Sequence, residues 1–274
     1  MTIASGDKRE HLRRAKQLFA TGQPADLLYA ALELRLCLEA MTYQKLESFE
    51  KHLPRSFLDR TWQPPQLLKA MAQFDRRADR SFTLAIGVES TPGAPVDPAA
   101  MKFLGEHKAF GLGWLRKNYN KLGSLLHLHR KSLLPDESKL RADLEGIADE
   151  IENAQTGSIL GSWIGELIHF ECQLCKEQVT ASRDFIEAEH RAICLNPACE
   201  AEYSAGLEGD GASIGLRAGA FRCTGCGEEI IVQTRHLASG FKAPCPACKR
   251  KHVIHCTWGG AADESTPQGE PGGE

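Results

Sequence analysis

The sequence has no long hydrophobic run and no recognisable export signal. Nowhere does it reach the roughly eighteen consecutive apolar residues that a membrane helix requires, and the basic N-terminal stretch, with Lys8, Arg9, Arg13 and Arg14, lacks the apolar core of a signal peptide. A phosphate-binding glycine loop, a zinc-protease helix motif and a nucleophile elbow are also missing. We therefore expect a cytoplasmic protein that has no membrane partner and belongs to none of these enzyme classes.

A strong net charge is absent too, but the charges are unevenly distributed. The formal charge is −3 over 274 residues, which excludes a uniformly basic nucleic-acid binder. Residues 1–163 hold 23 basic and 20 acidic side chains, residues 164–210 hold 3 and 10, residues 211–258 hold 7 and 2, and residues 259–274 hold none and 4. If the C-terminal third contacts phosphate, residues 211–258 are expected to make the contact.

Apolar residues at three- and four-residue intervals predict helices in the N-terminal part of the chain. The longest runs from Pro24 to about Glu50, and Pro24 suits a first helical turn. Further helices are expected over residues 7–20, 66–79 and 136–154, with prolines at the breaks.

The remaining segments have other patterns. Residues 81–88 (SFTLAIGV) are apolar and partly alternating, which predicts a short strand or an extended insertion. Helical character returns near Ala99 and is expected to continue, with interruptions at glycines, to about Arg130. Residues 259–274 are acidic and rich in Gly and Pro, so we expect them to be disordered.

Eight of the ten cysteines fall in close pairs with a regular spacing. One set reads C-x2-C, eighteen residues and C-x4-C, and the other reads C-x2-C, eighteen residues and C-x2-C. Two thiolates on a tight turn fill adjacent corners of a tetrahedron about a metal ion, and a hairpin returns the second pair to the other corners. The predicted ligands are Cys172, Cys175, Cys194 and Cys199 at one site, and Cys223, Cys226, Cys245 and Cys248 at the other.

Zinc is the metal that this donor set favours, with two Zn²⁺ per chain. Disulfides and iron–sulfur clusters are the alternatives, but the chain shows no export signal and iron–sulfur ligation usually has other spacings. Four cysteines leave no open position for water, so each site is expected to stabilise structure and not to activate a nucleophile. Of the other cysteines, Cys37 is expected to fill a helical core. Cys256 is expected to lie in a strand, with an exchangeable site shared with His252 or His255 as the alternative.

The second cysteine set, over about residues 221–256, resembles the widespread zinc-ribbon pattern of C-x2-C-G, a β-hairpin and C-P-x-C. Ribbons of this kind bind nucleic acid, bind proteins or brace a neighbouring domain. Here a small basic and aromatic surface suited to single-stranded nucleic acid is predicted, with a solvated ribbon edge as the alternative. It comprises Lys242, Lys249, Arg250 and Lys251 with the aromatic residues Phe241 and Trp258.

Two helices carry polar residues at a spacing typical of a second family. Arg35, Glu39 and Tyr43 share one helix face. A later helix supplies Arg116, Tyr119, Asn120 and His127. Over residues 25–135 the chain looks like prokaryotic HEPN-like helical domains, which pair an E-L-R helix with a helix that ends in a polar residue, a spacer and a histidine. The resemblance implies metal-independent cleavage of RNA by these side chains.

One position departs from the nuclease pattern. Asn120 stands where an arginine would stabilise the charge of the transition state. The alternative is a buried polar network in which Arg35 pairs with Glu39 and His127 bonds within the bundle.

These patterns predict an α+β protein with a mainly α-helical N-terminal bundle, two small β zinc ribbons and a disordered acidic tail. The expected parts are a helical HEPN-like domain over residues 1–135, a connecting helix and linker over 136–163, zinc ribbons over 164–210 and 211–258, and the tail over 259–274.

A regulatory or interaction protein is the function that the sequence favours. Its tandem ribbons would bind RNA, DNA or a protein partner, and its helical domain would form a homodimer. The alternatives are a HEPN-type ribonuclease, as a toxin or defence component, and a structural subunit of a larger complex. Because the two ribbons have opposite local charge, they are expected to have different partners.

Overall fold

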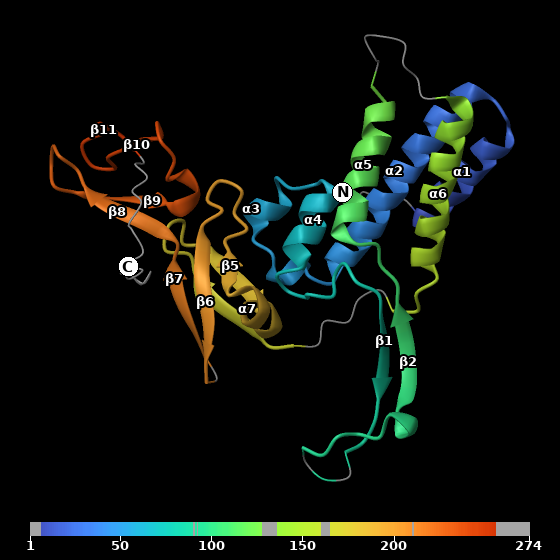
Figure 1. Cartoon of the computed structure of the whole chain (residues 1–274), viewed down its shortest axis with the longest axis horizontal. Coiled ribbons are helices and arrows are strands. Elements are labelled where there is room, and N and C mark those ends of the chain that lie inside the picture. Colours follow the sequence, from blue (N-terminus) through green and yellow to red (C-terminus); the bar gives the residue numbers. More distant parts are fainter. Residues whose placement is uncertain are drawn as a thin grey trace, which may run out of the picture. The chain divides into compact units, whose positions relative to one another are not determined.

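The computed structural model describes residues 7–89, 91, 93–127, 136–159, 165–209 and 211–255 (Figure 1). Most helices precede a series of small antiparallel sheets, so the predicted α+β class is confirmed. The chain divides into two compact units, residues 1–215 and 216–274. The acidic tail predicted over residues 259–274 lies outside the described residues.

The helices predicted from apolar periodicity are present, and local signals fix where they begin. Pro24 and Pro64 occupy first helical turns, where a backbone N–H has no partner within the helix. The carboxylates of Asp7 and Asp136 accept backbone N–H groups as N-caps. The α-helices of this part are α1 (Lys8–Ala20), α2 (Pro24–Glu47), α3 (Arg55–Leu58), α4 (Pro64–Met71), α5 (Leu112–Leu125) and α6 (Glu137–Gln155), and the 3₁₀ turns are η1 (Glu50–His52) and η2 (Pro98–Ala100).

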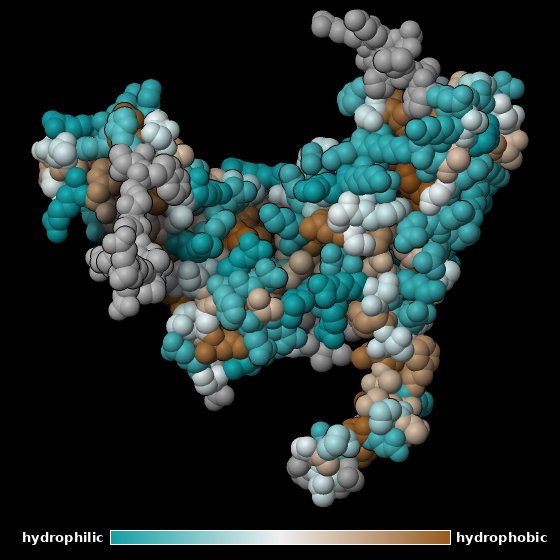
Figure 2. All heavy atoms as spheres, in the orientation of Figure 1, coloured by the Kyte–Doolittle hydropathy of each residue, from teal (hydrophilic) through white to brown (hydrophobic). Residues whose placement is uncertain are grey.

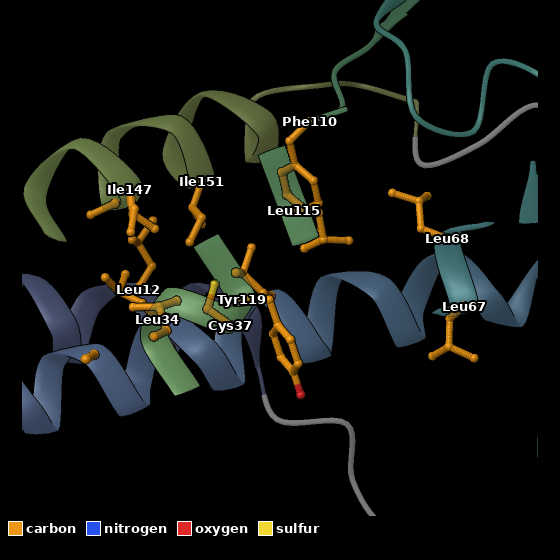
Figure 3. Close-up of a cluster of buried hydrophobic side chains, with 14 of the residues drawn as sticks. Leu12, Leu34, Cys37, Leu67, Leu68, Phe110, Leu115, Tyr119, Ile147 and Ile151 are labelled. Atoms are coloured by element: carbon orange, nitrogen blue, oxygen red, sulfur yellow. The ribbon is translucent and has the colours of Figure 1, made fainter. Parts of the chain in front are cut away.

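Helix α2 lies at the centre of the helical part and packs against α1, α4, α5 and α6. Fully buried side chains from three of these helices, Leu34, Leu115 and Ile151, meet in one hydrophobic cluster (Figure 3). Cys37 lies within it at 0% exposure, as predicted for a core filler, and burial raises the pKa of its thiol to about 12. This core fixes the backbone on which the later elements are mounted.

A β-hairpin projects from the helices where the sequence predicted more helix (Figure 1). Strand β1 (Phe82–Ile86) confirms the extended segment, but it pairs antiparallel with β2 (Lys102–His107), so the helix expected from Ala99 onward is wrong over this stretch. Gly105 disfavours a helix interior, and pairing with the uncharged strand β1 satisfies the backbone of β2. Helix starts only at Leu112, and residues 128–135 lie outside the described part.

The hairpin exposes apolar side chains. Ile86 is 57% exposed and Phe103 is 63% exposed, and brown surface follows the hairpin in Figure 2. An isolated two-stranded hairpin is marginally stable in water, so this element depends on its attachment to the helices. That attachment includes hydrogen bonds from the backbone N–H groups of Ser158 and Ile159 to the Glu106 carbonyl, at 2.9 and 3.1 Å.

The C-terminal part is built from short antiparallel strands. In the first unit β3 (Leu167–Glu171) pairs with β4 (Gln178–Ser182), helix α7 (Arg183–Glu189) follows, and β5 (Arg191–Ile193), β6 (Glu202–Glu208) and β7 (Gly211–Leu216) form a three-stranded sheet. The second unit contains β8 (Ala218–Arg222) paired with β9 (Glu229–Gln233), the 3₁₀ turn η3 (Thr234–His236), and β10 (Lys242–Pro244) paired with β11 (Lys251–Val253).

Candidate metal centres

The eight predicted cysteines gather into two clusters of four. Within each cluster all four sulfur atoms lie within 4.8 Å of one another. In the first, Sγ of Cys172 lies 3.7 Å from Cys199, and in the second, Sγ of Cys223 lies 3.6 Å from Cys248. The two groups expected from the spacing are therefore assembled as predicted, and each is suited to hold a metal ion.

The sulfur separations match a tetrahedral metal site. A metal–sulfur bond of about 2.3 Å places neighbouring sulfurs of a tetrahedron about 3.8 Å apart. A disulfide would need about 2.05 Å, and no described cysteine forms one. The clusters are thus open enough for a metal ion at their centres and too wide for disulfides.

Three of the four cysteine pairs are held by the same backbone turn, in which the N–H of the first cysteine donates to the carbonyl five residues on, as from Cys172 to Glu177 and from Cys223 to Glu228, both at 2.8 Å. The longer Cys194–Cys199 pair closes a wider turn, with a bond from the Cys194 N–H to the Ala201 carbonyl at 2.8 Å. The residue after the second cysteine has a positive φ in every pair. These residues are Lys176 (65°), Glu200 (45°), Gly227 (78°) and Lys249 (62°). Only one is glycine, so three side chains adopt a strained backbone conformation at a site that depends on it.

The two sites repeat each other beyond their cysteines. In the first, the Tyr203 hydroxyl donates to Cys172 Sγ at 3.1 Å, and its ring packs edge-on against Phe170. In the second, His252 Nε2 lies 3.3 Å from Cys223 Sγ, and its ring packs edge-on against Phe221. Each polar aromatic side chain stands four residues after the last cysteine of its set, and each phenylalanine two residues before the first.

The strand registers complete this repeat. In β3–β4, Leu167 pairs with Ser182, and in β8–β9, Ala218 pairs with Gln233, at corresponding positions of the two hairpins. The chain therefore contains the same four-cysteine hairpin arrangement twice. Tyr203 was not predicted as a site residue, and His252 was considered only as a partner of Cys256, although their equal distance from the last cysteine is visible in the sequence.

Hydrogen bonds prepare one thiol of each cluster for ionisation. The backbone N–H of Gly225 and the His252 side chain lower the pKa of Cys223 to about 5. Burial raises the pKa of Cys172, but the Tyr203 hydroxyl and the N–H groups of its turn outweigh burial and lower it to about 7. These sulfurs are thus favoured as thiolates, the form that binds metal.

Neighbouring thiols oppose ionisation of the rest. The N–H of Glu228 lowers the pKa of Cys226, but Cys248 and Cys245 raise it to about 12. Four thiolates this close repel one another, and a divalent cation at the centre removes that repulsion. The donor set therefore fits a bound metal ion better than four free thiols.

The first cluster is fastened to the helical part by Gln73, which is 3% exposed. Its amide Nε2 donates to the carbonyls of Thr180 (2.7 Å) and Ile193 (3.0 Å), and its Oε1 accepts the Ile193 N–H at 2.9 Å. Its own carbonyl accepts the Ser182 N–H at 2.8 Å. Gln73, which follows α4, thus links β4 and β5 to the helical part. The sequence patterns gave no sign of this role.

A second link reaches the cysteine turns themselves. The Ser56 hydroxyl of α3 donates to Glu177 Oε2 at 2.7 Å, and Asn196 donates to Glu177 Oε1 at 3.1 Å. Glu177 and Asn196 lie in the two turns that carry the first set of cysteines. The first metal site is therefore part of the same compact unit as the helices.

The basic residues predicted on the second ribbon are exposed. Lys242 begins β10 opposite Val253, and Lys251 begins β11 opposite Pro244, so the two lysines lie at opposite ends of this ladder. Lys249 and Arg250 lie in the turn after the last cysteine. The Arg250 guanidinium lies so close to Gly225 that a Cβ there would approach its Cζ to 2.7 Å. The structure thus gathers these four cations in the second unit, while Trp258 lies outside the described residues.

In the helical part, only some of the predicted catalytic residues come together. Arg35 donates to the Tyr119 hydroxyl at 2.7 Å and lies 3.5 Å from Glu39, and the Tyr119 hydroxyl donates to Glu39 at 2.7 Å. Arg116, Asn120 and His127 are exposed and do not join this network. The expected Arg35–Glu39 pair is present, and Tyr119, which was not among the predicted catalytic residues, joins it.

Comparison of the chain with protein-family models, curated proteins and solved structures found no match. The resemblances to zinc ribbons and to HEPN-like domains therefore gain no support from relatives. What stands on the structure is a mixed α+β protein with two four-cysteine centres suited to metal ions. None of the helices in the described ranges has the length and apolar character needed to cross a membrane.

Proposed function

We propose that the protein is a zinc-binding interaction protein with two zinc ribbons of different roles. The first ribbon braces the helical unit, and the second binds single-stranded nucleic acid through its basic surface. The observation that carries the proposal is the pair of four-cysteine clusters with tetrahedral sulfur spacing, one joined to helices and the other surrounded by exposed cations.

Zinc fits the donor set by its chemistry. Four thiolates in tetrahedral arrangement suit Zn²⁺ or iron, and Zn²⁺ is the usual ion of closed structural sites on paired cysteine turns. The residues that would hold it are the four cysteines of each cluster, with Tyr203 and His252 bonded to one sulfur each. No ligand position remains for substrate or water, so the metal would stabilise the ribbons without taking part in catalysis.

The charge and aromatic side chains of the second ribbon favour nucleic acid as its partner. Residues 211–258 hold 7 basic and 2 acidic side chains, against 3 and 10 in residues 164–210. Next to the cations, the rings of His236 and Phe241 stack at 5.0 Å between centroids and are partly exposed. Cations that follow a phosphate backbone and rings that stack on bases are the means by which proteins bind single strands.

Binding of fluorescent single-stranded RNA and DNA to the full-length protein tests this proposal. Replacing Lys249, Arg250 and Lys251 together by glutamine is expected to weaken binding at low salt at least tenfold. It is also expected to reduce the slope of log K against log salt by about 2, because three phosphate contacts are lost. The control is Lys176→Gln, which removes an exposed lysine from a positive-φ position in the first ribbon.

Equal affinity of the triple variant and the wild type would contradict the assignment of the surface. Absence of binding at low salt would contradict nucleic acid as the partner and favour a protein partner for the second ribbon. Zinc content should be measured on each variant, so that loss of binding is not confused with loss of the fold.

Ribonuclease activity is the weaker candidate, because the guanidinium of Arg35 is engaged by Tyr119 and Glu39. His127, just beyond the end of α5, is exposed and does not join the Arg35 network. Incubation with RNA in the presence of chelator compares the wild type with His127→Ala. RNA cleavage that is lost in His127→Ala would favour ribonuclease activity over the interaction function.

A further inference from the structure

A cleft in the helical unit has the features of a ligand site that the ribbons do not use. It has about 600 Å³ of empty space, its open mouth included, and lies where the start of α1, the C-terminal half of α2 and the end of α6 meet the segment after β2. Much of its wall is apolar. The apolar side chains include Met41, Leu68, Met71, Phe110 and Ile159.

The charged groups of this cleft all have one sign. Lys8, Lys45 and Lys108 reach it from three separate elements, and His107 stands beside Lys45. Among the described residues that line the cleft, none is acidic. Lys108 pairs with Glu106 at 3.8 Å, so the positive potential in this apolar space comes mainly from the ammonium groups of Lys8 and Lys45, and water screens it only in part.

Lys45 is the most buried of these cations. Its ammonium donates to the Ala78 carbonyl and lies 3.1 Å from His107 Nε2. His107 Nδ1 lies 2.8 Å from the Ile159 carbonyl, which can only accept, so Nδ1 carries the proton and Nε2 is the acceptor for Lys45. His107 is therefore neutral and leaves the charge of Lys45 uncompensated. Burial lowers the pKa of Lys45 to about 8.

The nearest carboxylates are committed to other donors. Asp75 accepts from the side chain and the backbone N–H of Arg77, at 3.2 and 2.9 Å. Asp79 accepts the backbone N–H of Leu112 at 3.2 Å. No carboxylate in the described part of the chain lies within ion-pair distance of the Lys45 ammonium, which leaves room for an anion from outside.

We propose that this cleft binds a small monocarboxylate with an apolar body, such as a medium-chain fatty acid. The carboxylate lies at Lys45 with Lys8 nearby, and the apolar chain lies along Met41, Leu68 and Phe110. A single carboxylate matches the single deeply placed ammonium, and the apolar wall excludes a ligand that is polar throughout.

Isothermal calorimetric titration of the full-length protein with octanoate tests this site. We expect saturable binding of one octanoate per chain, and at least tenfold weaker binding of 1-octanol, which has the same chain without the charge. Lys45→Met is expected to weaken octanoate binding at least tenfold. Lys69→Met, at an exposed position on the neighbouring helix α4, is expected to leave it unchanged.

Three results would overturn the proposal. They are no saturable binding of octanoate up to millimolar concentration, equal binding of octanol and octanoate, and wild-type affinity of Lys45→Met. If Lys45→Met does not fold, Lys8→Gln is tested in its place and is expected to weaken octanoate binding several-fold. The comparison of octanoate with 1-octanol then still shows whether the carboxylate is recognised. The outcome is independent of metal and nucleic-acid binding, because the cleft shares no residue with the ribbons.

Discussion

Gly123 shows how one missing side chain permits a polar contact between two helices. A Cβ on this residue of α5 would lie 2.2 Å from Nη1 of Arg35 on α2. That guanidinium donates to the Tyr119 carbonyl and hydroxyl, at 3.3 and 2.7 Å, and its Cζ lies 3.9 Å from the centre of the Tyr119 ring. Glycine at position 123 therefore leaves the space that the Arg35 guanidinium fills. The hydrogen bonds between Arg35 and Tyr119 link α2 to α5.

Gly123→Ala is expected to lower the free energy of unfolding by ~1–2 kcal/mol, because the loss of charge-assisted hydrogen bonds exceeds the gain in helix propensity. The matched control is Gly146→Ala in α6, where a Cβ meets no atom within 4 Å. It should raise the free energy of unfolding by up to ~1 kcal/mol. Urea unfolding of both variants measures these changes. Equal changes in the free energy of unfolding, in the same direction, would show that a Cβ at position 123 does not clash with Arg35.

The residues of the candidate metal centres and of the helical network differ in how readily the sequence reveals them. The cysteines could be assigned because metal ligation demands a fixed spacing on a tight turn, which the chain displays directly. Tyr203 and His252 could have been found because each stands four residues after the last cysteine of its set. A tyrosine and a histidine are different residue types, however, so their equivalence is not obvious from the sequence. Arg35 and Glu39 were visible as a helix pair, whereas Tyr119 comes from a different helix and required the tertiary structure.

Among the elements, the contact between α4 and the first ribbon depends most on a single residue. Gln73 supplies both ends of its amide to β4 and β5 in a nearly fully buried position. The amide completes hydrogen bonds that neighbouring strands would otherwise have to make. This role resembles that of a short strand placed between two others.

Gln73→Met is expected to lower the free energy of unfolding of the first unit by ~2–4 kcal/mol, because buried backbone groups of Thr180 and Ile193 lose their partners. Gln66→Met, at an exposed position of α4, is the control and should change it by less than ~0.5 kcal/mol. Amide exchange of residues 178–193 measures the local effect. Unchanged protection of this segment in Gln73→Met would show that the link is dispensable.

Elements formed by local pattern were predicted well, and those formed by distant pairing were not. Helices α1, α2 and α6 follow from apolar periodicity and end signals within each segment. Strand β2 was predicted as helix because its extended form is stabilised by β1, a partner about twenty residues earlier. The attachment of the first ribbon by Gln73 involves partners more than a hundred residues away and leaves no periodic signal.

On the scale of the whole molecule, the two metal centres are supported by unequal amounts of hydrophobic core. The first belongs to a unit with a large helical core. The second unit has a small buried cluster of Cys223, Ile230, Val232, Ala243 and Cys245, and two of these are proposed metal ligands. So small a core does not offset the entropy of folding without metal.

Removal of metal by a chelator is therefore expected to unfold the second unit while the helices persist. Hydrogen exchange followed by mass spectrometry should show complete loss of protection over residues 218–253. Protection in α2 and α5 should change by less than a factor of about ten, since their core contains no cysteine ligand. Loss of protection in both units at the same chelator concentration would contradict independent roles for the two centres.

Each chain is proposed to hold two zinc ions, each bound by four sulfur atoms. X-ray absorption at the zinc edge, together with the zinc content of the same sample, measures both the number of ions and their ligands. We expect about two zinc ions per chain, each surrounded by four sulfurs at about 2.3 Å, with no nitrogen or oxygen ligand. A single zinc per chain, iron in place of zinc, or a shell that mixes sulfur with nitrogen or oxygen would contradict this proposal.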